Sequence, residues 1–120
     1  ALEAAVQKGW IRYPGFSNYP ARKAQRLIDL QHQRHFTPMA GAQMYYSMLG
    51  RDLDGDSKDF ITANGLGLMT WSPLASGFLS GKYSKENPVP EDSRRVKFDF
   101  PPVDIDKGYK VIEALSSIAD

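Results

Sequence analysis

Apolar and polar positions along the chain recur with two periods, one typical of helices and one of strands. Residues 1–8 carry apolar side chains at helical spacing. Residues 11–16 have the pattern of a strand, and Asn18 followed by Pro20 predicts an N-cap and an early-turn proline for a helix over residues 21–33. The pattern therefore predicts a strand that passes into a helix through a short loop.

The same order of strand and helix recurs further along the chain. Residues 39–44 form a second short apolar run, and the pattern predicts a helix over residues 57–63. Residues 66–71 are apolar without polar alternation, which predicts a third strand that is covered on both faces. A long segment rich in proline and charge, residues 84–102, then precedes a last helix that begins at Asp106.

This order of elements is the alternation that builds parallel α/β folds with right-handed crossovers. Three parallel strands leave two unpaired sheet edges, and an α/β barrel usually has about 250 residues. We therefore expect residues 1–120 to form a single partial domain, an incomplete barrel of the α/β class. Exposed sheet edges would also let copies of the chain pair into a homo-oligomer.

Composition adds little that is specific. The chain is 42% hydrophobic with a formal charge of +1, and its basic residues are scattered, which argues against nucleic acid as a partner. It has no cysteine, which excludes a disulfide framework and suits a cytoplasmic protein. No apolar run approaches the roughly 20 residues of a membrane-spanning helix, and the first residues lack the order of a signal peptide.

The carboxyl ends of the predicted strands are where ligands gather in parallel α/β folds. These ends present amides, hydroxyls and an aromatic ring, with neither a carboxylate nor a histidine, so they predict binding rather than proton transfer. Trp71 offers a face for stacking, although its position alone equally suits a core tryptophan. Donors and acceptors for a flat, amide-bearing group come from Ser17, Asn18 and Gln43.

Small residues follow Trp71 and would let a ligand approach the backbone closely. Lys82 and Arg94 suit a phosphate group, although a cluster such as residues 93–95 is more often solvent-facing charge. Residues 77–82 miss the spacing of a phosphate-binding P-loop. Residues 52–63 have Ser57 and Ala63 where a calcium-binding EF-hand has glycine at the sixth place and glutamate at the twelfth. We therefore predict no metal site.

Three motifs, in this order, resemble a known family: KGWIRYPGFSNYP, AQMYYSMLGRD and WSPLASGFLSGKY. They are similar to the second half of the aldo-keto reductases, which are (β/α)8 barrels that reduce carbonyls with a nicotinamide cofactor, usually NADPH. The likeness spans nearly the whole chain, from the helix before barrel strand five to the helix before strand eight. It is strongest for the Trp-Ser-Pro-Leu branch, which includes bacterial reductases and potassium-channel β subunits.

The resemblance implies a cofactor site and a small aldehyde or ketone substrate. It places Ser17, Asn18 and Gln43 at the nicotinamide carboxamide and Trp71 against the ring. It lines the pyrophosphate with Ser72, Pro73, Leu74, Ala75 and Ser76, with Lys82 and Arg94 nearby.

The family's catalytic Asp, Tyr, Lys and His come from the first four strands, so the resemblance implies no catalytic residue here and no turnover by this chain alone. NADPH is the expected cofactor and NADH the alternative, since the loop that distinguishes them follows strand eight. A rival hypothesis is a non-catalytic module that binds a nucleotide or a partner.

Overall fold

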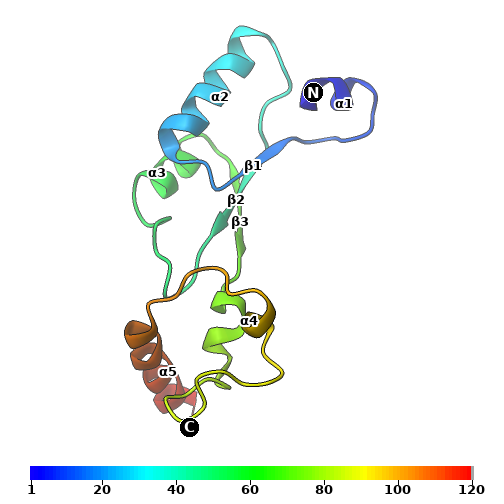
Figure 1. The fold of residues 1–120 in the computed structure, drawn as a ribbon. Coiled ribbons are helices and arrows are strands. Elements are labelled where there is room, and N and C mark those ends of the chain that lie inside the picture. The colour runs from blue at the N-terminus through cyan, green and yellow to red at the C-terminus, as the bar shows by residue number, and fades with distance from the viewer. Residues whose placement is uncertain (120) are drawn as a thin grey trace. The chain divides into compact units, whose positions relative to one another are not determined.

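A computed structural model describes residues 1–119, which form two compact units. The first unit comprises Ala1–Tyr45 and Asp52–Trp71, and the second comprises Tyr46–Arg51 and residues 72–119. Figure 1 shows the helices and strands of both units. Over the described residues, no helix has both the length and the apolar character needed to cross a membrane.

The first unit is built on a parallel sheet of three strands in the order β1-β2-β3. Helices connect the strands, so the predicted alternation of parallel strands and helices, a portion of an α/β barrel, is confirmed. The elements are α1 (Leu2–Gln7), β1 (Gly15–Ser17), α2 (Ala21–Gln33), β2 (Gly41–Tyr45), α3 (Asp56–Ala63) and β3 (Gly67–Trp71).

Each strand begins with a glycine, and the three glycines are in register. Gly15 pairs with Gly41, and Gly41 pairs with Gly67. A Cβ atom on Gly41 would lie 2.8 Å from the carbonyl oxygen of Gly67, and one on Gly15 would lie 2.9 Å from that of Gly41. Because backbone atoms are on the other side of each contact, neither Gly15 nor Gly41 has room for a side chain.

The two faces of the sheet differ in burial. Phe16 and Ala42 are paired across β1 and β2, and both are buried. The next pair along, Ser17 and Gln43, points to the opposite face and is exposed, and Met69 of β3 continues this row. Helices α2 and α3 contact each other (Figure 1), and their buried side chains are Ala24, Ile28 and Gln31 of α2 and Ile61 of α3.

Two of the predictions about strands were wrong. The first strand covers Gly15–Ser17 rather than residues 11–16, because it pairs only alongside β2, which begins at Gly41. The prediction that residues 66–71 are covered on both faces also fails. In this structure β3 is an edge strand bonded to β2, and its residues 67–70 are exposed.

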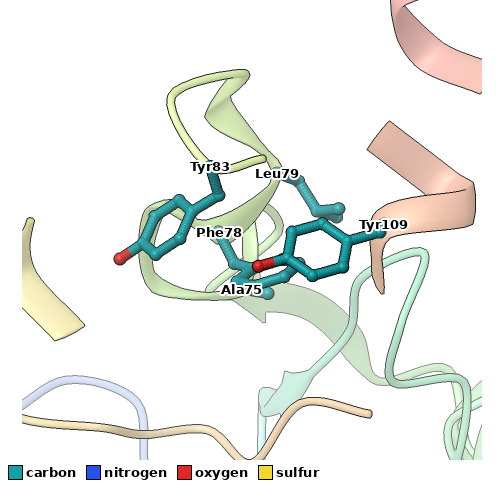
Figure 2. Packing of buried hydrophobic residues seen from close by; sticks show 5 residues of the cluster. All are labelled: Ala75, Phe78, Leu79, Tyr83 and Tyr109. Atoms are coloured by element: carbon teal, nitrogen blue, oxygen red, sulfur yellow. The ribbon is translucent and has the colours of Figure 1, made fainter. Parts of the chain in front are cut away.

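The second unit has a core of its own. It contains a 3-10 segment, η1 (Ala75–Ser80), and the helices α4 (Arg94–Lys97) and α5 (Ile105–Ala119). Phe78 is 1% exposed, and its ring centroid lies 4.9 Å from that of Tyr83 and 5.8 Å from that of Tyr109 on α5 (Figure 2). Buried Ala75 and Leu79 complete the cluster. The packing of these rings therefore holds α5 against η1 and against the segment that follows η1.

Candidate functional site

Asn18 joins the carboxyl ends of all three strands. Its Oδ1 atom accepts hydrogen bonds from the backbone N–H of Tyr45 and from the indole Nε1–H of Trp71, both at 3.0 Å. Its own backbone N–H donates to the carbonyl oxygen of Gln43 at 3.1 Å. Because Oδ1 accepts from two fixed donors, the side-chain NH2 group is the part that can engage a carbonyl oxygen of a ligand.

The prediction that Asn18 caps a helix was wrong. Its backbone is left-handed, with φ of 53°, and the N-cap of α2 is Pro20, which makes no side-chain capping bond. Asparagine adopts this conformation more readily than most residues. With the chain turned in this way, the side chain bonds to the ends of β2 and β3 instead of to the first turn of α2.

Trp71 is half-buried at the end of β3. Tyr45 is its partner across β2 and β3, and the two ring centroids lie 4.9 Å apart with an angle of 38° between the planes. The indole nitrogen is engaged by Asn18, which fixes the ring at the end of the sheet. Trp71 is thus neither fully buried nor fully exposed, and its stacking on a ligand stays a prediction.

The exposed face of the sheet carries two successive rows of side chains. Ser17, Gln43 and Met69 form one row, and Tyr45 with Trp71 forms the next row toward the carboxyl ends. The structure therefore brings Ser17, Gln43 and Trp71 together on one face, and Asn18 lies in the loop after β1. Met69, which is 60% exposed, was not predicted. Only the strand register, which the sequence pattern leaves open, places it beside Gln43.

The segment after Trp71 folds back on itself in the second unit. Ser72, Ala75 and Ser76 have left-handed φ values of 51°, 48° and 57°. The backbone N–H of Ala75 donates to the carbonyl oxygen of Ser72 at 2.9 Å, which closes a tight turn. Ala75 is completely buried, whereas Pro73 and Leu74 are exposed and the two serines are half-buried. A ligand at this turn would meet the serines, Pro73 and Leu74, but not the methyl group of Ala75.

The two predicted cations lie on segments that are tied to each other. Lys82 is 35% exposed, and its Nζ atom lies 3.7 Å from a carboxylate oxygen of Asp92. Arg94 is exposed at the start of α4. The residues next to them, Tyr83 and Ser93, share a buried hydrogen bond between their hydroxyl groups.

Arg95 was missed by the sequence reasoning. Residues 93–95 have the pattern of solvent-facing charge, but the side chain of Arg95 is only 8% exposed. The neighbouring Arg94 is exposed, so the two arginines differ in a way that their shared charge does not reveal.

The chain is similar in sequence to known proteins over most of its length. The chain is 39% identical over 95 residues to an L-glyceraldehyde 3-phosphate reductase of Escherichia coli O157:H7, covering 78% of this chain and 27% of the relative. Over 95 residues it is 35% identical to a probable voltage-gated potassium channel subunit beta of Arabidopsis thaliana, covering 78% and 29%. The chain thus spans less than a third of the length of these relatives.

The family model of the aldo/keto reductases matches residues 1–120. The match includes the ends of the three strands and the turn that follows Trp71. The chain therefore belongs to the aldo/keto reductase family.

Proposed function

We propose that this chain supplies part of the cofactor site of an NADP(H)-dependent oxidoreductase that reduces a small aldehyde or ketone to an alcohol. The supporting observation is the placement of Asn18, whose side chain is held between Tyr45 and Trp71. An NH2 donor beside an aromatic ring, with Ser17 and Gln43 on the same face, suits a nicotinamide and its carboxamide. When bound, this group supplies the hydride.

We further propose that residues 72–76, Lys82 and Arg94 contact cofactor phosphates, as membership of the family implies. Lys82 and Arg94 supply positive charge, and the turn over residues 72–76 supplies serine hydroxyls and backbone. NADPH is the proposed cofactor and NADH the alternative. Family membership and the charge of these two side chains support the choice of a phosphate-bearing cofactor.

The proposed role of the chain is binding rather than proton transfer. None of the described side chains in the two exposed rows of the sheet, or at Asn18, is a carboxylate, histidine or lysine. General acid–base catalysis most often uses such groups or a tyrosine, and Tyr45 in these rows packs against the ring of Trp71. We therefore expect NADPH oxidation with generic aldehydes to stay at background for this chain alone.

Fluorescence of Trp71 tests the proposal. Trp10 is 73% exposed and would obscure the signal, so the titration uses a Trp10→Phe background in which Trp71 is the remaining tryptophan. We expect NADPH to quench the fluorescence in a saturable manner, with NADH titrated in parallel. Absence of quenching at millimolar NADPH would contradict the proposal.

Asn18→Asp is the matched variant for this titration. A carboxylate keeps an acceptor for Tyr45 and Trp71 but has no NH2 donor for the carboxamide. We expect about tenfold weaker NADPH binding, the effect of one hydrogen bond of about 1.4 kcal/mol. The thermal midpoint should stay close to that of the parent. Unchanged affinity would remove Asn18 from the proposed site.

A further inference from the structure

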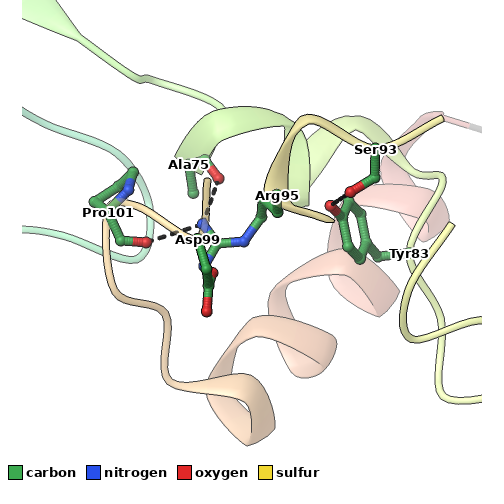
Figure 3. A network of polar contacts seen from close by, with 6 residues as sticks. All are labelled: Ala75, Tyr83, Ser93, Arg95, Asp99 and Pro101. Atoms are coloured by element: carbon green, nitrogen blue, oxygen red, sulfur yellow. Dashed lines mark hydrogen bonds and ion pairs between the residues drawn. The ribbon is translucent and has the colours of Figure 1, made fainter. Parts of the chain in front are cut away.

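One buried side chain joins three segments of the second unit. Nη1 of Arg95 donates to the carbonyl oxygens of Ala75 at 3.2 Å and Pro101 at 2.9 Å (Figure 3). Nη2 pairs with the carboxylate of Asp99. The guanidinium carbon also lies 5.9 Å from the ring centroid of Phe78. Arg95 therefore connects the left-handed turn at Ala75, helix α4 and the segment that precedes α5.

These contacts require the planar set of donors on arginine and not only its positive charge. A guanidinium group presents five N–H donors in a rigid plane, whereas a lysine ammonium is a compact charge on a flexible chain. The donors of Arg95 are directed to two carbonyl oxygens and a carboxylate, and the side chain is 8% exposed. Arg95 is thus engaged with its own chain and is not placed to meet a ligand.

A second buried contact lies on the other side of Arg94. The hydroxyl groups of Tyr83 and Ser93 share a hydrogen bond (Figure 3), and the backbone N–H of Ser93 donates to the carbonyl oxygen of Pro90 at 3.0 Å. Arg94 is therefore an exposed cation between Ser93, which is buried, and Arg95, whose side chain is 8% exposed. Helix α4 spans only Arg94–Lys97, too short to persist without such contacts.

We propose that Arg95 and the Tyr83–Ser93 hydroxyl pair are positioning residues for Arg94. They hold the backbone of Arg94 in one arrangement, so that Arg94 binds a cofactor phosphate without first ordering its segment. Ordering of a loop is a free-energy cost of binding, and fixing the loop beforehand removes it. The inference rests on the proposed function, because Arg94 is assigned there to the phosphates.

A double-mutant cycle on NADPH affinity tests this coupling. We expect about tenfold weaker binding for Arg94→Met, the loss of one charge-assisted contact, and about fivefold for Arg95→Met. If Arg95 acts through Arg94, the double variant should be about tenfold weaker, not about fiftyfold. Arg95→Lys should not restore affinity, because lysine lacks the planar set of donors.

Lys97→Met is the control for charge, since Lys97 is an exposed cation on the same helix. We expect it to change affinity less than twofold. Every titration is made at a temperature where circular dichroism shows the variant folded. Additive effects of Arg94→Met and Arg95→Met would overturn the positioning role, because a merely structural effect does not depend on Arg94.

If Arg95→Met does not fold, Tyr83→Phe tests the positioning inference in its place. It keeps the ring beside Phe78 and removes only the hydroxyl group that bonds Ser93. We expect about threefold weaker NADPH binding, again without additivity to Arg94→Met. If the parent binds NADPH saturably and neither Arg95→Met nor Tyr83→Phe changes the affinity, the positioning inference is overturned. The proposed function then still stands. Absence of NADPH binding by the parent overturns the proposed function as well.

Discussion

Gly41→Ala tests whether the strands approach each other closely at the row of glycines where they begin. The added Cβ atom would lie 2.8 Å from the carbonyl oxygen of Gly67 and 3.4 Å from its carbonyl carbon. Neither atom belongs to a flexible side chain, so relief of the contact requires β2 and β3 to move apart.

The expected loss of stability follows from two opposing terms. Overpacking of this kind costs about 1–3 kcal/mol. Replacing glycine by alanine also restricts the unfolded chain, which returns about 0.4–1 kcal/mol. We therefore expect Gly41→Ala to lower the free energy of unfolding by about 1–2 kcal/mol. At roughly 4–8 °C per kcal/mol for a small domain, the thermal midpoint should fall by about 4–16 °C.

Tryptophan fluorescence during urea unfolding measures this loss. Trp10 and Trp71 both belong to the first unit, so the signal reports on the sheet that contains Gly41. Gly55→Ala is the control, because no atom lies within 4 Å of its added Cβ and its φ of −156° lies outside the left-handed region. Equal urea midpoints for the two variants would refute the argument from close approach.

Three further predictions concern other parts of the chain. Hydrogen bonds from the Gln7 side chain, and then from the backbone N–H of Thr37, lower the pKa of Glu3. Its contribution to stability should therefore be present above pH 4.5 and lost as pH falls through the lowered pKa, and Glu3→Gln should remove this part of the pH dependence of urea unfolding. Phe78→Ala should cost about 3–5 kcal/mol, measured by circular dichroism, whereas loss below about 1 kcal/mol would contradict the described core. Asn18→Ala should be about 1 kcal/mol less stable than Asn18→Gly in thermal unfolding, because φ is 53° there, and the opposite order would contradict the left-handed assignment.

Periodicity in the sequence predicted the parts of the fold that depend on local pattern. The helix over residues 21–33 has the bounds predicted for it, and the parallel order of strands and helices is confirmed. The first strand was predicted too early because residues 11–14 have strand-like side chains but do not pair with β2. Pairing depends on a partner strand, and side-chain pattern alone does not locate that partner.

The long-range contacts of the site were beyond the same reasoning. Asn18 has the local pattern of a helix cap, yet its side chain bonds Tyr45 and Trp71, which are 27 and 53 positions away. Arg95 has the pattern of surface charge, but the carbonyl oxygens of Ala75 and Pro101 make its burial favourable. In both cases the deciding partner lies on another segment, which only the folded chain brings near.

The shared acceptor on Asn18 has a consequence for motion at the end of the sheet. A single oxygen atom protects the amide proton of Tyr45 and the indole proton of Trp71 from exchange with solvent. Displacement of the loop that carries Asn18 exposes both protons in one event, so their exchange rates should respond together to temperature and denaturant. We therefore expect the strand ends to open as one cooperative unit instead of fraying separately.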